Sequence, residues 1–300
     1  MSCIGRFAPS PTGPLHSGSL LAALAGYLDI RAQGGQWLLR IEDLDPPREV
    51  AGAADLILFA LERFRLHWDG PVSYQSTRLE LYRAELDRLR RDGLAYPCQC
   101  SRKQLSERDA VLHYDGHCRR YPPPRSARCA IRAVAPATEI EFIDRIQGTR
   151  SYAGDHAPGD FVIFRRDGFF AYQLAVVVDD AEQGITQVTR GADLIDETPR
   201  QLILQRHLGY GRPRYAHIPV LTNAQGQKLS KQTFARPLDL SEELIARQLV
   251  RALQLLGQQP PRDAQTGSAE EILHWAIAHW RLDRIPKQLS LAAPASTDHV

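Results

Sequence analysis

Two stretches of this sequence hold residues whose types and spacing suit the binding of a phosphorylated ligand. The first is the turn-rich stretch 9–19, in which His16 lies between two glycines ahead of an apolar helical pattern. Glycine lets a backbone approach a ligand closely, and the unpaired amides at the start of a helix favour an anion such as a phosphate. We expect Ser17 or Ser19 to cap this helix. The stretch therefore predicts a nucleotide-phosphate site.

The second stretch is a late loop in which two lysines flank a small hydroxyl. Lys228 and Lys231 enclose Leu229-Ser230, and a compact ammonium group is suited to holding β- and γ-phosphates. Glu42 directly follows the apolar residues 36–41, so it faces the crevice at the carboxyl end of a predicted strand. Taken singly, an acidic turn and a pair of lysines also suit an ordinary solvated surface.

A third group of residues is typical of a metal site. Three of the five cysteines, Cys98, Cys100 and Cys118, lie in a region with few periodic apolar positions. The chain has no signal peptide, so this clustering favours metal over disulfides. Zinc takes four tetrahedral ligands of this borderline kind and would stabilise a module that lacks a core. By zinc chemistry alone, His117 or His113 is the preferred fourth ligand.

The predicted elements place these groups on an α/β fold. Strands over 4–8 and 36–41 enclose a helix over 17–32, which predicts a right-handed parallel βαβ unit with the first loop at the carboxyl end of its strand. Strands over 161–166 and 170–178 are expected to pair through a two-residue hairpin turn at Asp167-Gly168. The other expected elements are helices over 51–64, 77–92, 197–208, 242–256 and 269–282 and a strand over 185–190.

Length and composition favour one large domain with an insertion. The 300 residues are 43% hydrophobic, and 37 basic residues against 35 acidic ones give a net charge of +2, which neither requires nor excludes nucleic acid. The absence of a long apolar run and of a signal peptide predicts a cytoplasmic protein without membrane association. We divide the chain into residues 1–95 (first half of the catalytic domain), 96–137 (metal-binding part of an insertion), 138–238 (remaining insertion and second half of the catalytic domain) and 239–300 (C-terminal helical segment).

The two loops together resemble the signature loops with which class I aminoacyl-tRNA synthetases hold ATP. Within that class, Arg6-Phe7-Ala8-Pro9-Ser10-Pro11-Thr12-Gly13 and Arg40-Ile41-Glu42-Asp43-Leu44-Asp45 are similar to the glutamyl branch, and the resemblance extends over residues 4–240. It implies a Rossmann-like parallel sheet with an inserted zinc-containing module similar to an acceptor domain. Both loops occur in the order and with the flanks of the glutamyl branch, which makes the combination highly specific.

The chain departs from full glutamyl-tRNA synthetases in two respects. Only a short helical segment follows the second loop, so no anticodon-binding domain is expected, and Ser19 stands where the consensus has a second histidine. The second loop reads Lys-Leu-Ser-Lys-Gln instead of Lys-Met-Ser-Lys-Ser. Both features are similar to truncated paralogues that activate glutamate without tRNA and esterify it onto queuosine in the anticodon of tRNA(Asp). The alternatives are a short glutamyl-tRNA synthetase that charges a tRNA 3′ end, or a non-catalytic paralogue that binds nucleotide or RNA.

The resemblance also implies a role for individual residues. It points to Tyr114 as the fourth zinc ligand, with the histidines at 113 and 117 as rivals, and to a monomer that uses ATP with Mg²⁺, L-glutamate and queuosine-containing tRNA(Asp). Arginines at 119, 120, 125, 128 and 132 are candidates for contact with the tRNA backbone. The expected site residues are His16, Lys228 and Lys231 for catalysis, His16, Gly18, Ser19, Lys228, Ser230 and Lys231 for ATP, Arg6, Phe7, Ala8, Pro9, Ser10, Glu42, Tyr172 and Arg190 for glutamate, and Cys98, Cys100, Tyr114 and Cys118 for zinc.

Overall fold

A parallel sheet of five strands lies at the centre of the computed structural model, which describes residues 3–111, 113–124, 126–223, 225–229 and 236–293. Along the chain, the second and third strands of this sheet are added on one side of the first strand, and the last two are added on its other side. The strand order therefore reverses at the first strand. Open α/β sheets bind ligands at such a switch point, outside the carboxyl ends of the strands. In sheet order the strands are β10 (Arg214–Ile218), β9 (Gln187–Gly191), β1 (Ile4–Phe7), β2 (Gln36–Ile41) and β3 (Ser73–Tyr74).

The first βαβ unit forms as the sequence predicts. α1 (Ser17–Arg31) joins β1 to β2, which pair in parallel. Every residue of α1 from 20 to 30 except Ala22 is buried, because the helix lies between the sheet and the C-terminal helices. A helix that is apolar on nearly all sides is stable only when it is covered on all sides. The predicted helices over 51–64 and 77–92 are α2 (Ala53–Arg63) and α3 (Leu79–Arg91).

The prediction of two paired strands over 161–178 is wrong in its second half. β8 (Phe161–Phe164) forms and the chain turns at Asp167-Gly168, where the amide of Arg165 donates to the carbonyl of Phe169 at 2.8 Å. After Ala171, however, the chain continues as α6 (Tyr172–Glu182), in which every residue from 173 to 180 is buried. Periodicity cannot separate a buried strand from a buried helix in so short an apolar run. The helix packs on α7 (Thr198–Leu208), which forms as predicted.

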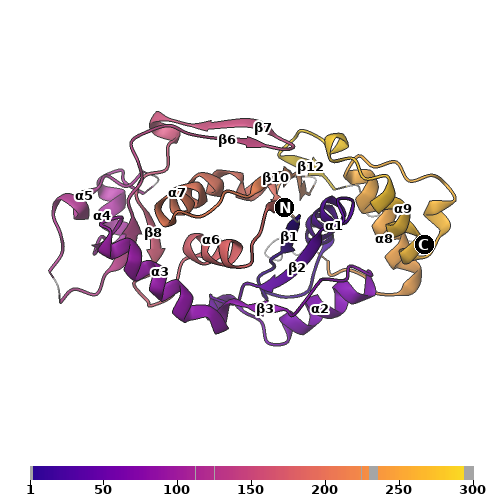
Figure 1. Ribbon diagram of the computed structural model, residues 1–300, viewed down its shortest axis with the longest axis horizontal. Helices are drawn as coiled ribbons and strands as arrows, with labels where there is room; N and C mark the ends of the chain where they lie inside the picture. The colour runs from indigo at the N-terminus through magenta and orange to yellow at the C-terminus, as the bar shows by residue number, and fades with distance from the viewer. Residues whose placement is uncertain (1–2, 112, 125, 224, 230–235, 294–300) are drawn as a thin grey trace.

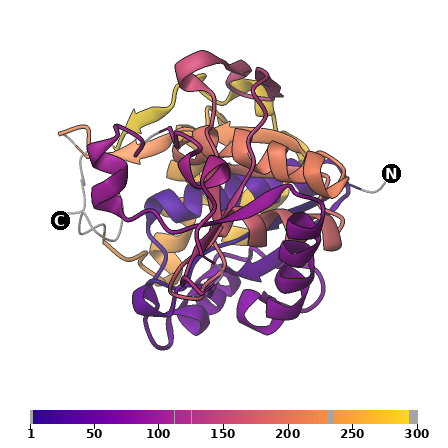
Figure 2. The ribbon, with the colours of Figure 1, turned by 90° about the vertical axis from the view of Figure 1, so that its left-hand side faces the viewer.

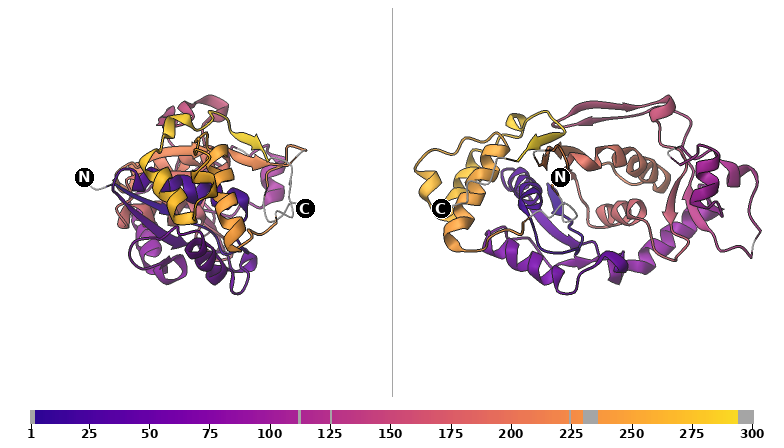
Figure 3. Two further views of the ribbon diagram at one scale, coloured as in Figure 1. Left: turned by 90° about the vertical axis from the view of Figure 1, so that its right-hand side faces the viewer. Right: turned by 180° about the vertical axis from the view of Figure 1, so that it is seen from behind.

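A small module is inserted between α3 and α6. Its antiparallel sheet has the order β4-β5-β8, with β4 at Ala95–Cys98 and β5 at Ala130–Ala133. It also contains α4 (Arg102–Glu107) and α5 (His117–Arg120). Figure 2 looks onto this end of the molecule. A hairpin of β6 (Ile140–Asp144) and β7 (Gly148–Tyr152) runs from the module along one long edge of the molecule toward the C-terminal segment (Figures 1 and 3).

The C-terminal segment packs against the first βαβ unit at the opposite end of the molecule from the inserted module (Figure 1). α8 (Glu242–Leu255) and α9 (Ala269–Ala278) form where helices are predicted, although α9 ends four residues early. Their buried side chains belong to the same apolar cluster as those of α1 and β2. β12 (Ser290–Ala292) pairs in parallel with β11 (Val220–Thr222). None of the helices in the described part of the chain has the length and apolar character needed to cross a bilayer.

Candidate active site and metal centre

The first loop presents the amino end of α1 to the carboxyl edge of the sheet. The sequence predicts a serine cap, but the N-cap is His16, whose Nδ1 accepts from the amides of Gly18 at 3.1 Å and Ser19 at 3.3 Å. Imidazole can take the place of a hydroxyl here because its ring nitrogen reaches the same orphan amides. The accepting Nδ1 carries no proton, so the proton of a neutral ring is on Nε2. His16 therefore both ends the loop and sets the direction of the helix amides.

The two predicted phosphate loops lie next to each other. A Cβ atom built on Gly18 would lie 3.8 Å from the carbonyl oxygen of Leu229, and His16 forms a β-bridge with Pro237 beyond the second loop. Lys228 Nζ is 2.5 Å from a carboxylate oxygen of Asp193, which follows β9. The other two predicted ATP contacts on this loop, Ser230 and Lys231, lie outside the described residues.

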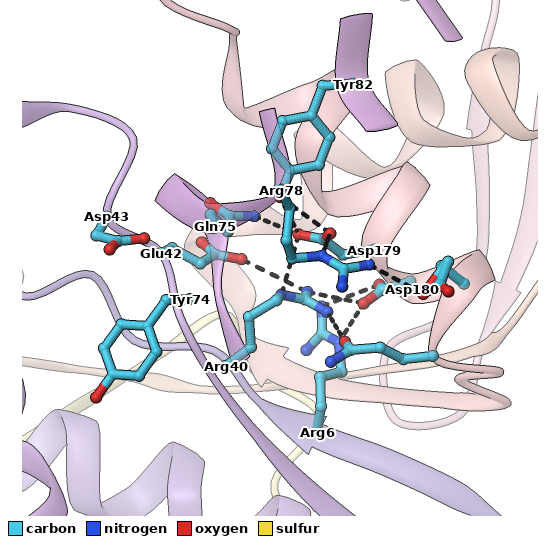
Figure 4. Close-up of polar contacts among 12 residues, drawn as sticks. Arg6, Arg40, Glu42, Asp43, Tyr74, Gln75, Arg78, Tyr82, Asp179 and Asp180 are labelled. Atoms are coloured by element: carbon cyan, nitrogen blue, oxygen red, sulfur yellow. Dashed lines mark hydrogen bonds and ion pairs between the residues drawn. The ribbon is translucent and has the colours of Figure 1, made fainter. Parts of the chain in front are cut away.

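Arg6 belongs to a buried network of charges that joins β1, β2 and α6 (Figure 4). Asp180 on α6 accepts from Arg6 Nε at 3.0 Å and Nη2 at 3.3 Å, and from Arg40 Nη2 at 2.8 Å. Arg40 is fully buried, and its Nε lies 3.6 Å from Asp179. Since isolated buried charges are very costly, the two arginines and two aspartates stabilise one another in fixed positions. The network attaches α6 to β1 and β2 at the carboxyl edge of the sheet.

Glu42 lies beside this network at the end of β2. Its amide donates to the carbonyl of Pro9 at 3.0 Å, which attaches the first loop to the strand. Its side chain is 9% exposed and lies 3.6 Å from Arg40 Nη2, and its Oε1 has no hydrogen-bond partner among the described residues. Burial raises the pKa of Glu42 to about 7, although the charges of Arg40 and Arg6 lower it. Oε1 is also the oxygen that faces Arg40 Nη2, so the two groups form an ion pair without a hydrogen bond.

Arg190 lies on β9, across the switch point from Arg6, and its guanidinium donates on three sides. Its Nε donates to His217 Nε2 at 3.0 Å, its Nη2 to the hydroxyl of Thr198 at 2.9 Å and its Nη1 to the hydroxyl of Tyr172 at 3.2 Å. His217 Nδ1 is 2.6 Å from Asp144 Oδ2. Burial lowers the pKa of His217 to about 4, so the ring is neutral near pH 7.

Tyr172 accepts from Arg190 and lies within electrostatic range of Glu42 and Arg6. Burial raises its pKa, the charge of Arg190 lowers it, and the charges of Glu42 and Arg6 also act on it. Four of the predicted glutamate-binding residues therefore lie near one another, since the charges of Arg6, Glu42 and Arg190 all act on Tyr172. The predicted residues Phe7, Ala8, Pro9 and Ser10 follow Arg6 along β1 and the loop, where Phe7 stacks on Trp37 and Ser10 is exposed.

Three cysteine thiols form a cluster in the inserted module. The sulfur atoms of Cys98, Cys100 and Cys118 lie within 4.8 Å of one another. The hydroxyl of Tyr114 is 3.4 Å from Cys98 Sγ and 3.4 Å from Cys100 Sγ, and it accepts from the amide of Cys118 at 2.8 Å. Three thiols and one oxygen around a common centre fit a tetrahedral metal site.

The two histidines that zinc chemistry favours lie away from the thiols. His113 Nδ1 is 3.1 Å from the carbonyl of Ala157, and the ring of His117 packs against Tyr121. Arg132, a predicted tRNA contact, instead lies over the ring of Tyr114 at 4.0 Å. The arrangement favours the tyrosine over either histidine as the fourth group of the cluster.

The other arginines of the insertion differ in their surroundings. Arg132 Nε donates to Cys98 Sγ at 3.3 Å, so this side chain belongs to the thiol cluster. Arg128 donates to the carbonyl of Arg166 at 2.9 Å. Arg119 and Arg120 are exposed on α5, although Arg119 approaches Asp160 at 3.5 Å. The remaining candidate, Arg125, lies outside the described residues.

Comparison with known proteins identifies the family. Residues 3–282 match the family model for the catalytic domain of class I tRNA synthetases (E and Q). The chain belongs to this family. It is 54% identical to the glutamyl-Q tRNA(Asp) synthetase of Dechloromonas aromatica, over 97% of this chain and 98% of that protein. It is 53% identical to the protein of the same name from Pseudomonas aeruginosa strain LESB58, over 97% of both.

Two solved structures of glutamate-specific members of the class are also similar. A glutamate tRNA ligase from Elizabethkingia meningosepticum, solved with its amino acid, superposes with a TM-score of 0.81 at 25% identity. That match covers 97% of this chain and 67% of the ligase. A glutamate-tRNA synthetase from Elizabethkingia anophelis gives a TM-score of 0.82 at 26% identity, over 98% of this chain and 68% of that one.

Sequence reasoning missed the residues that hold the predicted ligand-binding groups in position. Arg40 lies inside a buried strand, and Asp179-Asp180 follow three consecutive valines, so each places charge inside an apolar run. Buried charges almost always have partners, which is the signal that could have linked them. Asp144 and His217 stand 73 residues apart. Nothing in the local sequence connects that pair.

Proposed function

We propose that this member of the class I synthetases activates L-glutamate with ATP to glutamyl-adenylate without tRNA, and then transfers glutamate to queuosine in the anticodon of tRNA(Asp). The observation that carries this proposal is the grouping of Arg6, Glu42 and Arg190 at the carboxyl edge of the sheet, where all three charges act on Tyr172 and offer two cations and one anion. Glutamate carries two carboxylates and one ammonium group, so its charges match these residues. The high identity to proteins named glutamyl-Q tRNA(Asp) synthetase supports the choice of acceptor.

In this proposal Arg6 and Arg190 bind the two carboxylates of glutamate. Arg6 already uses Nε and Nη2 on Asp180, and Arg190 uses Nε and Nη2 on His217 and Thr198. The ligand therefore meets the remaining guanidinium donors, including Arg190 Nη1 beside the hydroxyl of Tyr172. Glutamine would place a neutral amide against an arginine, and sites reject such polar mismatches strongly.

Glu42 holds the α-ammonium group. An ammonium group supplies the hydrogen-bond donor that Glu42 Oε1 lacks, and its positive charge favours the ionised carboxylate. Bound this way, glutamate directs its α-carboxylate toward the first loop, because the loop is attached to the same strand end through Pro9. The pocket thus positions the nucleophile for the next step.

The chemical step is attack of the α-carboxylate on the α-phosphorus of ATP, with pyrophosphate as the leaving group. A carboxylate is already a nucleophile, so this step requires no general base. His16, whose Nε2 carries the ring proton, donates to the phosphates at the positive amino end of α1, while Lys228 and Lys231 offset the negative charge that develops on pyrophosphate. Mg²⁺ neutralises phosphate charge when ATP is bound, and we assign no protein ligand to it.

The transfer step uses a hydroxyl of the queuosine cyclopentenediol as the nucleophile. It attacks the carbonyl carbon of glutamyl-adenylate, an ester bond forms and AMP leaves; the phosphate of the departing AMP can accept the proton, so no further base is assigned. Arg119 and Arg120 are exposed on the inserted module and are our candidates for contact with the anticodon stem-loop backbone. ATP and tRNA are cytoplasmic substrates, and we propose a cytoplasmic monomer.

We also propose that the thiol cluster binds one structural Zn²⁺ through Cys98, Cys100, Tyr114 and Cys118. The three thiols and the tyrosine oxygen are the donor set that was predicted, and they already lie within contact distance of one another. The metal would stabilise the fold of a module that has few buried apolar side chains. In this division of the chain, residues 1–95 form the first half of the catalytic domain, 96–137 the zinc part of the insertion, 138–238 the rest of the insertion and the second half of the catalytic domain, and 239–300 the C-terminal helical segment.

Exchange of labelled pyrophosphate into ATP tests the first half of the proposal. With purified protein, glutamate and no tRNA, we expect exchange, and glutamine should support little. No exchange with glutamate would overturn the proposed activity and favour a nucleotide- or RNA-binding paralogue.

The acceptor is tested separately with labelled glutamate. We expect label on tRNA(Asp) only when the tRNA contains queuosine, and the label should survive removal of the 3′ terminal adenosine. Label that is removed with that adenosine would instead identify a short glutamyl-tRNA synthetase.

A further inference from the structure

We propose that Asp144 and His217 are positioning residues that set the orientation of Arg190 and thereby the affinity of the enzyme for glutamate. This inference rests on the proposed role of Arg190 as a carboxylate ligand. Asp144 lies at the end of β6 in the hairpin of the insertion, whereas His217 lies on β10 of the central sheet. The hairpin is thus linked to Arg190 through the buried side chains of Asp144 and His217.

The carboxylate of Asp144 is held in one orientation by backbone amides. Its Oδ1 accepts from the amides of Ile146 at 2.9 Å, Gln147 at 2.8 Å and His217 at 3.2 Å. Three N–H groups converge on one oxygen, so only an acceptor can occupy this position. Oδ2 therefore faces His217, at 2.6 Å from Nδ1.

These contacts determine the tautomer of His217. Arg190 Nε always carries a hydrogen and points at His217 Nε2 from 3.0 Å, so Nε2 must accept. The proton of the neutral ring is then on Nδ1, where Asp144 Oδ2 accepts it. His217 and Asp144 are both completely buried at their side chains, so water is not available to replace either partner.

The imidazole in turn limits how Arg190 can turn. With Nε on His217 and Nη2 on Thr198, and the guanidinium 5.3 Å over the ring of Tyr215, the planar group has its Nη1 directed at Tyr172. A planar guanidinium group that is held through Nε and Nη2 can present its remaining N–H groups in only one direction. Preorganisation of this kind lowers the entropy that ligand binding must overcome.

The variant Asp144→Asn tests the inference because it reverses the hydrogen bonds without changing the shape. The three amides keep the amide oxygen of Asn at the Oδ1 position, so its NH₂ group replaces Oδ2 and donates to His217 Nδ1. The ring must then carry its proton on Nε2, which faces the N–H of Arg190 Nε. Two opposed donors would displace the guanidinium. We expect the KM for glutamate in pyrophosphate exchange to rise about ten- to hundred-fold, with the KM for ATP unchanged.

A second variant separates orientation from general damage to the fold. In His217→Gln the side-chain oxygen can occupy the place of Nε2 and accept from Arg190, so the KM for glutamate should rise less than in Asp144→Asn. The matched control is Glu141→Gln, which neutralises an exposed carboxylate on the same hairpin and should behave as wild type.

Each outcome bears on one proposal. The proposed positioning role of Asp144 and His217 would be overturned by any of three results. These are wild-type glutamate affinity in Asp144→Asn, a larger rise in the KM for glutamate in His217→Gln than in Asp144→Asn, or equal changes in the KM for glutamate and the KM for ATP. Wild-type protein without glutamate-dependent exchange would instead overturn the proposed function. If Asp144→Asn does not fold, His217→Gln is compared with His217→Leu, which has no acceptor for Arg190. A rise in the KM for glutamate as large in His217→Gln as in His217→Leu would contradict the need for an acceptor at the position of Nε2.

Discussion

Replacement of Glu42 by glutamine should make the protein more stable while it weakens glutamate binding. The pKa of Glu42 lies at about 7 instead of 4.5, because burial outweighs the attraction of Arg40 and Arg6. Between pH 4.5 and 7 the folded chain keeps a proton that the unfolded chain releases. The free energy of unfolding therefore falls as the pH rises through this window. Above pH 7, the ionised carboxylate lowers the free energy of unfolding by an amount that no longer changes with pH.

The size of this cost follows from the two pKa values. Ionised Glu42 lowers the free energy of unfolding by about 3 kcal/mol at pH 8 and by about 1 kcal/mol at pH 5.5. Glutamine does not titrate, so the stability of Glu42→Gln relative to wild type should increase by about 2 kcal/mol between these pH values. The same charge binds the α-ammonium group of glutamate, and wild-type KM for glutamate should be about tenfold higher at pH 6 than at pH 8.

Urea unfolding at pH 5.5, 7 and 8 measures the first effect, and pyrophosphate exchange measures the second. In exchange, Glu42→Gln should raise the KM for glutamate about thirty- to hundred-fold, because the variant cannot form the charge-assisted hydrogen bond. Glu62→Gln, on the exposed face of α2, is the control for removal of one negative charge. A relative stability of Glu42→Gln that does not change with pH would refute the reasoning, as would glutamate affinity equal to wild type.

Three further outcomes are expected. Tyr114→Phe should lower the zinc content of the purified protein, whereas His117→Ala should leave it unchanged, and metal analysis with the reverse result would exchange their roles. The double variant Arg119→Ala, Arg120→Ala should weaken tRNA binding. The slope of log affinity against log salt concentration should become shallower by about one for each phosphate that an arginine no longer neutralises. Unchanged binding would exclude these residues from the tRNA surface. Leu24→Ala, in the fully buried middle of α1, should cost about 3 kcal/mol in urea unfolding, and a cost below about 1 kcal/mol would contradict its place in the core.

Several parts of the fold could be predicted because their signals are local. The strand, glycine-rich loop and helix of the first βαβ unit have apolar spacings and turn residues that act within a few positions of one another. The cysteines are also close in sequence, so their clustering already indicated a metal site. The failure at 170–178 has the opposite cause, since an apolar run that is buried on every side carries no periodic signal.

The cap of α1 is a smaller failure of the same kind. Serine is the more common N-cap, and two serines stand at the start of the helix, but His16 occupies the position and accepts from both amides. Propensity alone ranks residue types at a cap. The path of the chain into α1, which brings His16 next to Pro237, decides which residue occupies the N-cap.

From the sequence alone came the fold class, the two loops that meet at one edge of the sheet, and the charged residues proposed to contact glutamate. The fold class and the loops depend on residue type and short-range spacing, whereas the assignment of the charged residues to glutamate is what the resemblance to the glutamyl branch implies. Only the tertiary structure determined which charges hold others in place: Asp180 between Arg6 and Arg40, and Asp144 behind His217 and Arg190. Their partners are distant along the chain, and a buried charge has no fixed partner until folding removes water and leaves only the neighbours that can replace it.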